Sequence, residues 1–140
     1  IGKCGSKSWQ AEGLKNAVTR HPGVNFVICH LLAPNGKQEE ELKRALEGLA
    51  LPNVWFDLAS VPHNCMDASE PWKRAGAYVR LARDLVGADK LLFGTDMPSA
   101  LKEAPYGDYV RWIREMEGLN DAEREQILYQ NAAKVYAGLS

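Results

Sequence analysis

Several features typical of membrane and nucleic-acid-binding proteins are missing from this sequence. No apolar run approaches the ~20 residues of a membrane-spanning helix, and no signal peptide is visible. The 17 basic and 18 acidic residues give a net charge of −1 and form no basic stripe. Neither a nucleic acid nor an anionic membrane is therefore an expected partner. Internal repeats and low-complexity segments are also absent.

Cysteine is scarce. The three cysteines, Cys4, Cys29 and Cys65, form no CxxC motif and have no regular spacing. A sparse, odd set indicates free thiols in a reducing compartment, which predicts a cytoplasmic protein. Cys29 lies in an apolar stretch and is expected to pack as a small hydrophobe. A nucleophilic Cys29 paired with His30 is disfavoured, because neighbours along a strand point to opposite faces.

Apolar residues make up 46% of the 140 residues, enough for the core of one domain. Their periodicity predicts helices at 8–20, 37–49, 72–86, 106–117, 121–129 and 131–137, and strands at 24–29, 54–58 and 91–93. The alternation predicts right-handed crossovers and a parallel sheet in an α/β fold. The first strand is apolar throughout, as expected where both faces are covered. Three strands are few for a sheet that stands alone.

Polar residues follow each predicted strand at its carboxyl end. The first strand leads to His30, the second to Asp57 and then Ser60, and the third to Thr95 and Asp96. Adjacent parallel strands lie about 4.8 Å apart, so these side chains are expected to share one rim. In parallel α/β folds the chemistry lies at this rim, and His with Asp suits either metal ligation or acid/base catalysis.

Each of these side chains also has a purely structural interpretation. His30 could hydrogen-bond a loop carbonyl, and Asp57 and Asp96 could each stabilise a turn. His63, in a polar loop, is expected to be exposed rather than a ligand. Asn131, near a helix start, is expected to be a cap. If all of them are structural, the chain is a small non-catalytic α/β module.

Four segments of the sequence resemble one family. They are HPGVNFVICH (21–30), NVWFD (53–57), ADKLLFGTDMP (88–98) and NAAKVY (131–136). In order and spacing they resemble the C-terminal part of the amidohydrolase-related family. The branch in question contains metal-dependent decarboxylases and hydrolases such as aminocarboxymuconate-semialdehyde decarboxylase. The resemblance covers nearly the whole chain.

The resemblance implies a (β/α)8, or TIM, barrel in which 24–29, 54–57 and 91–94 are the sixth, seventh and eighth strands. Asp96 would then be a metal ligand or the base that activates a metal-bound water, and His30 would polarise a carbonyl or move a proton. The implied cofactor is a divalent metal, expected to be zinc, which lowers the pKa of bound water to roughly 7. The implied activity is hydrolysis or non-oxidative decarboxylation of a small carboxylated or cyclic substrate.

The sequence also departs from the family. It lacks the His-x-His pair of the first strand and the histidine of the fifth, and Leu31 and Leu32 stand where glycines are usual, which should change the pocket wall. A (β/α)8 barrel needs about 200 residues or more. We therefore expect residues 1–140 to form one domain, a partial TIM barrel without its N-terminal half. Such a piece would have an incomplete metal site and no activity alone.

Two further expectations follow from this departure. A partial barrel leaves strand edges bare at both open sides, so self-association or completion by the missing barrel half is expected. The sequence opens at Ile1 in what looks like a loop already under way, which points to a longer protein. One alternative of the same barrel type also stays open: a metal-free lactone hydrolase in which Asp96 acts on water directly.

Overall fold

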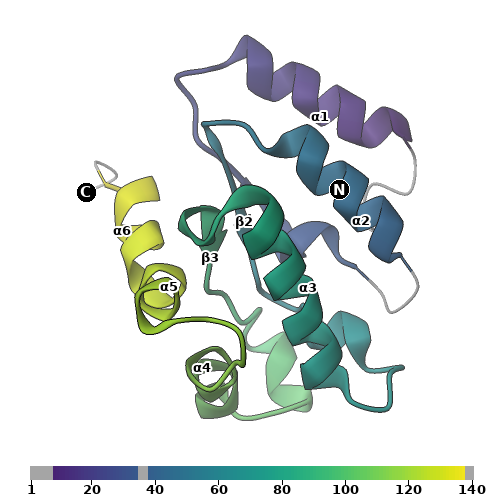
Figure 1. The fold of residues 1–140 in the computed structure, drawn as a ribbon, viewed down its shortest axis with the longest axis vertical. Coiled ribbons are helices and arrows are strands. Elements are labelled where there is room, and N and C mark those ends of the chain that lie inside the picture. The colour runs from purple at the N-terminus through teal and green to yellow at the C-terminus, as the bar shows by residue number, and fades with distance from the viewer. Residues whose placement is uncertain (1–7, 35–37, 138–140) are drawn as a thin grey trace.

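The computed structural model describes residues 8–34 and 38–137. Its elements follow the predicted order (Figure 1). They are α1 (Ser8–Arg20), β1 (Phe26–Ile28), α2 (Glu39–Leu49), β2 (Val54–Asp57), α3 (Pro71–Val86), β3 (Leu91–Leu92), α4 (Tyr106–Arg114), α5 (Asp121–Glu125), a π-helical turn (Gln126–Gln130) and α6 (Asn131–Val135). Short 3-10 turns lie at Cys29–Leu32, His63–Cys65, Ala88–Lys90 and Ser99–Lys102. No helix in the described ranges has the length and hydropathy to span a membrane.

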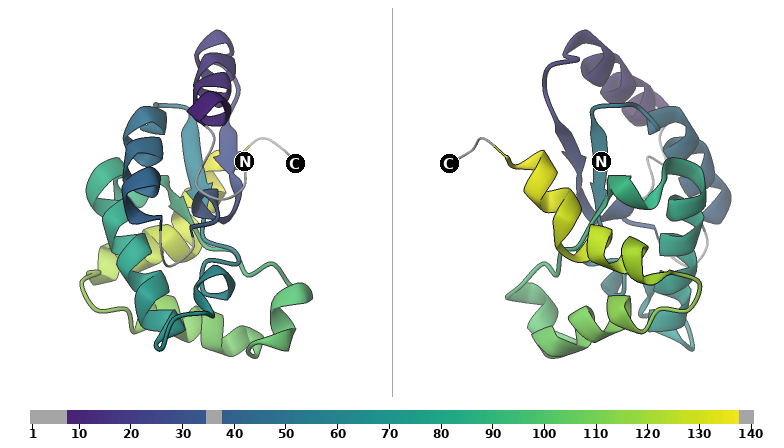
Figure 2. Two further views of the ribbon diagram at one scale, coloured as in Figure 1. Left: turned by 90° about the vertical axis from the view of Figure 1, so that its right-hand side faces the viewer. Right: turned by 60° about the vertical axis from the view of Figure 1, so that its left-hand side comes forward.

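The three strands form one parallel sheet in the order β1-β2-β3, so β2 is the central strand. Phe26 of β1 pairs with Val54, and Phe56 of β2 pairs with Leu91. Helices α2 and α3, which connect the strands, lie side by side along the sheet (Figure 2). The predicted parallel α/β arrangement is confirmed, and the carboxyl ends of all three strands lie at one edge.

The connecting helices cover one face of this sheet. Along β2, Val54 and Phe56 are fully buried in the core that α2 and α3 share, whereas Trp55 and Asp57 on the opposite face are half-buried. Val24, at the start of the first predicted strand, is 51% exposed. Val24 lies before β1, in which Phe26 and Val27 are half-buried and Ile28 is buried. Within the described residues the helices between the strands therefore cover only one face of a strand that was expected to be covered on both.

All three strands are shorter than predicted, and β2 loses only its last residue, Leu58. β1 ends at Ile28 because Cys29 begins a 3-10 turn, and the residues from His30 to Ala33 then have positive φ. β3 ends at Leu92, and the next amide, that of Phe93, donates to the carbonyl of Ile127 in the π-helical turn (2.8 Å). The carboxyl end of β1 is therefore set by the 3-10 turn, and that of β3 by a hydrogen bond to a group outside the sheet.

The backbone hydrogen-bonding groups on the outer edge of β3 are paired with residues of the C-terminal helices, α5 to α6. The carbonyl of Leu92 faces β2, where it accepts a backbone hydrogen bond, so Leu91 O and Phe93 N–H point away from β2. Asn131 Nδ2 donates to Leu91 O at 2.8 Å, and Phe93 N–H is held by the π-helical turn. The expectation of a bare edge is wrong for β3, because helix groups take the positions of a neighbouring strand.

Asn131 is also not the helix cap that the sequence predicted. It follows the π-helical turn without a break in the helical backbone, and its side chain is fully buried. Besides Leu91 O, its Nδ2 atom donates to Ala88 O at 2.8 Å. Asn131 therefore fixes the start of β3 against the C-terminal helices.

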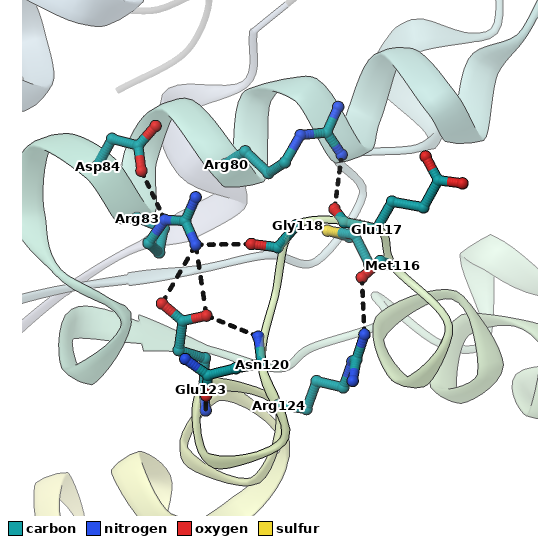
Figure 3. A network of polar contacts seen from close by, with 9 residues as sticks. All are labelled: Arg80, Arg83, Asp84, Met116, Glu117, Gly118, Asn120, Glu123 and Arg124. Carbon is teal, nitrogen blue, oxygen red and sulfur yellow. Dashed lines mark hydrogen bonds and ion pairs between the residues drawn. The ribbon is translucent and has the colours of Figure 1, made fainter.

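Arginines of α3 hold the loop between α4 and α5 (Figure 3). Arg83 donates to the carbonyl of Gly118 at 2.7 Å and forms an ion pair with Glu123 at 3.2 Å. Glu123 also accepts from the amide of Asn120 at 2.8 Å, and Asn120 accepts in turn from the Glu123 amide, so α5 begins with a capping box. Gly118 has φ +84°, and a side chain there would collide with Arg80. These contacts attach the C-terminal helices to α3.

Asn131→Asp tests the attachment of β3. The substitution keeps the shape of the side chain but places a carboxylate against the Ala88 and Leu91 carbonyls in place of two N–H donors. We expect the free energy of unfolding, from urea denaturation, to fall by about 3 kcal/mol. The control Asn16→Asp, at an exposed position of α1, should cost less than about 0.5 kcal/mol. Equal losses in the two variants would contradict this role.

Candidate active site

His30 and Asp96 lie at the same edge of the sheet. His30 follows β1 and Asp96 follows β3, and the Nε2 atom of His30 is 4.0 Å from Oδ1 of Asp96. Their side chains are 37% and 43% exposed. The structure thus brings together, across the end of β2, the two residues that sequence analysis selected as catalytic. Parallel strands with a shared carboxyl edge are the reason.

Ser60 joins this pair from the loop after β2. Its hydroxyl donates to Oδ2 of Asp96 at 2.6 Å, and the residue is only 6% exposed. This length is typical of a charge-assisted O–H···O⁻ bond. One oxygen of Asp96 is therefore held by Ser60, while the other faces His30. The sequence predicts Ser60 at the rim but carries no signal for this contact, because Ser60 and Asp96 are far apart in the chain.

Asp57, the last residue of β2, has a structural function. Its Oδ1 atom accepts the backbone N–H of His30 at 2.9 Å and that of Ala59 at 3.0 Å. The carboxylate thus fixes the turn after β1 and the turn after β2 together. This agrees with the interpretation of Asp57 as a turn former, and it makes Asp57 the residue that orients the backbone of His30.

The backbone at the site is left-handed. In the described part of the chain, all non-glycine residues with positive φ follow a strand: residues 30–33 after β1, Ser60 after β2 and Asp96 after β3. The values are +60° for His30, +56° for Ser60 and +62° for Asp96. Such conformations cost about 1 kcal/mol or more for residues with a β-carbon, and they concentrate at functional sites. All three residues of the Ser60–Asp96–His30 group share this conformation.

Leu31 and Leu32 lie in the core. Both side chains are fully buried and belong to the cluster formed with α2, α3 and β2. The expectation that they alter the pocket wall is wrong, because the left-handed turn directs their side chains into the protein. They anchor the turn that carries His30.

Neither Cys29 nor Cys65, the cysteines of the described residues, has the properties of a nucleophile. Cys29 is exposed, which corrects the expectation of a packed side chain, and loss of some hydration around its thiol together with the charge of Asp57 raises the pKa of the thiol. Burial raises the pKa of Cys65 to about 11. Both thiols are thus protonated near neutral pH, whereas a catalytic cysteine needs a lowered pKa. Cys4 lies outside the described residues.

His63 is exposed, as predicted. Its Nδ1 atom lies 2.8 Å from Oε1 of Glu103. The ring therefore pairs with the loop after β3 rather than with the rim.

The donors at the rim fit part of a divalent metal site. Asp96 offers one carboxylate oxygen that Ser60 does not use, and His30 offers an imidazole nitrogen, both common zinc ligands. Within the described residues, no group of three or more His, Cys, Asp or Glu side chains could hold a metal ion. A catalytic zinc site has three protein ligands. The described rim accordingly supplies fewer ligands than such a site uses.

Comparison with known proteins decides the family. The sequence profile of the family described as amidohydrolase matches residues 5–138. The chain belongs to the amidohydrolase family. A curated relative, an L-fucono-1,5-lactonase from Burkholderia ambifaria, is 31% identical over 67% of this chain and 33% of its own length. The family that the four segments resembled is thereby confirmed.

Solved structures confirm the fold. An amidohydrolase from Burkholderia multivorans with bound zinc has a TM-score of 0.80 at 24% identity, covering 91% of this chain and 49% of that one. A dihydroxybenzoic acid decarboxylase from Polaromonas with bound manganese has a TM-score of 0.56 at 13% identity, covering 88% and 36%. This member of the amidohydrolase family has the fold of part of a TIM barrel, and it spans between a third and a half of the length of these relatives. Divalent metals occur in both of these solved structures.

Asp57→Ala tests whether Asp57 holds the His30 turn. Removal of the carboxylate leaves the amides of His30 and Ala59 without their acceptor, so we expect the free energy of unfolding to fall by about 2–3 kcal/mol. Asp57→Asn, which retains an acceptor oxygen, should cost less. Urea denaturation measures both, with Asp67→Ala, at an exposed aspartate, as the control. A loss for Asp57→Ala that matches the control would show that the turn does not depend on Asp57.

Proposed function

We propose that this chain supplies one side of the active site of a hydrolase that opens a small cyclic ester, a lactone. The observation that carries the proposal is that His30 faces Asp96 at the carboxyl ends of parallel strands. The lactonase among the relatives supports a cyclic ester as the substrate class. Because the chain spans a third of that relative, the activity is proposed for the whole protein and not for these residues alone.

In this proposal Asp96 is the general base. Ser60 occupies its Oδ2 atom, and Oδ1 is left to accept the proton of the water that attacks the lactone carbonyl. An ionised carboxylate only accepts hydrogen bonds, so it binds such a water in the orientation that proton transfer needs.

His30 acts as the general acid. Its Nε2 atom lies 4.0 Å from Asp96 Oδ1, too far for a direct hydrogen bond, so both groups can contact a reacting group. As the water oxygen bonds to the carbonyl carbon, the bond from that carbon to the ring oxygen breaks, and protonated His30 donates its proton to the ring oxygen. The product is a hydroxy acid, after which Asp96 gives its proton to solvent and His30 takes one up.

A divalent metal beside Asp96 would supply a positive charge that makes water a stronger acid and polarises the carbonyl. Among the described residues, Asp96 is the proposed ligand, because Ser60 holds only its Oδ2 atom, and His30 keeps its role as the acid. The remaining ligands would come from other parts of the protein. Zinc and manganese are the metals found in the similar structures.

Asp96→Asn tests the role of the base. The amide keeps the size of the side chain but cannot accept the proton of water, so we expect kcat/KM for L-fucono-1,5-lactone to fall by about 1,000-fold, and His30→Gln to lower it by about 100-fold. Acid release at constant pH measures turnover in the whole protein, with Asp67→Asn as the control. Undiminished turnover in Asp96→Asn would favour the non-catalytic interpretation. Release of carbon dioxide from a carboxylated substrate, with no lactone opening, would favour a decarboxylase.

Metal removal tests the cofactor. Dialysis against a chelator should lower lactone hydrolysis by about 100-fold or more, and added zinc or manganese should restore it. Metal analysis of the dialysed protein serves as the control. Full activity in metal-free protein would favour the metal-free lactone hydrolase in which Asp96 acts on water directly.

A further inference from the structure

The two carboxylate oxygens of Asp96 have different surroundings. Oδ2 accepts the hydroxyl of Ser60 at 2.6 Å, whereas Oδ1 lies 4.0 Å from Nε2 of His30. The terminal torsion of an aspartate is broad, with no strong preference of its own. The orientation of the Asp96 carboxylate must therefore be selected by contacts, and Ser60 provides the short one.

The hydroxyl of Ser60 is itself rigidly placed. Ser60 is nearly buried and has φ +56° within a turn closed by the Val61 N–H to Leu58 O bond (3.3 Å). Its carbonyl accepts the amide of Asn64 at 2.9 Å. A serine in this conformation forgoes the more favourable right-handed backbone, and only the surrounding bonds keep it there. These bonds fix the backbone from which the hydroxyl of Ser60 reaches Asp96.

Close packing between the loops after β2 and β3 supports the same contact. A β-carbon at Gly94 would lie 3.0 Å from the β-carbon of Ala59 and 3.4 Å from its amide nitrogen. Glycine at position 94 therefore lets the two loops approach to a distance that any other residue would increase. Ser60 follows Ala59 directly and Asp96 is two residues beyond Gly94, so this approach brings the hydroxyl within reach of the carboxylate.

We propose that Ser60 is a positioning residue for the reaction, which holds Oδ2 of Asp96 so that Oδ1 is presented to the water and to His30. The inference rests on the proposed function, in which Asp96 is the base. Ser60 touches neither substrate nor metal in this role. Its loss lets the carboxylate rotate, and a displacement of about 1 Å at a reacting group can cost about 100-fold in rate.

Ser60→Ala and Ser60→Gly together test this role. Both remove the hydroxyl, and glycine also accepts the positive φ of this position without cost. In the whole protein we expect kcat for L-fucono-1,5-lactone to fall by about 10- to 100-fold in both variants, with KM within about two-fold of the parent. The melting temperature should be retained in Ser60→Gly. Ser69→Ala, at an exposed serine of the following loop, is the control and should change none of these values.

The outcomes separate this inference from the proposed function. A kcat within about two-fold of the parent in Ser60→Gly, while Asp96→Asn is inactive, would overturn the positioning role and leave Asp96 as the base. If kcat and the melting temperature fall in Ser60→Ala but keep the parent's values in Ser60→Gly, the residue has only a structural role. A rise in KM as large as the fall in kcat in the Ser60 variants would also overturn the positioning role. Undiminished activity in Asp96→Asn would instead overturn the proposed function.

Discussion

The arrangement of the site depends on two hydrogen bonds to a single oxygen atom, Oδ1 of Asp57. Asp57 ends the central strand, and this atom accepts the amide of His30 from the turn after β1 and the amide of Ala59 from its own turn. Because Asp57 is only half-buried, the two bonds together contribute about 2–3 kcal/mol. Ser60 follows Ala59 and binds Asp96 beyond β3. The three strand ends are thus joined by side-chain contacts as well as by the sheet.

These contacts, together with the core, explain how unfavourable backbone conformations persist at the rim. Left-handed residues with a β-carbon are retained only where the surroundings determine them strongly. After β1 the fully buried Leu31 and Leu32 provide that constraint, and after β2 the turn of Ser60 is closed at both ends by backbone hydrogen bonds. The cost of the conformations is therefore offset by packing and bonding next to the site. The gain is a fixed direction for His30, Ser60 and Asp96.

The sequence allowed the parallel strands and their shared rim to be predicted, because apolar runs and helical periodicity are local signals. That the three strands are consecutive neighbours came from the family resemblance. It did not allow the left-handed turns to be predicted, since the positions carry His, Leu, Ser and Asp and not glycine. The role of Asn131 was missed for a related reason: its partner carbonyls lie 40 residues or more away, and its position near a helix start is typical of a cap. Contacts distant in sequence likewise determine the length of β3 and the binding of Ser60 to Asp96.

The exposure of the rim to water limits the reactivity of His30 and Asp96. In the described residues His30 and Asp96 are more than a third exposed, and charged groups with this exposure interact weakly because water screens them. Proton transfer and charge stabilisation are strongest where water is excluded. The matched relatives are about twice as long as this chain, so we infer that their remaining strands are what covers this rim. On this argument the left-handed turns orient the groups, whereas their reactivity depends on walls contributed by the rest of the barrel.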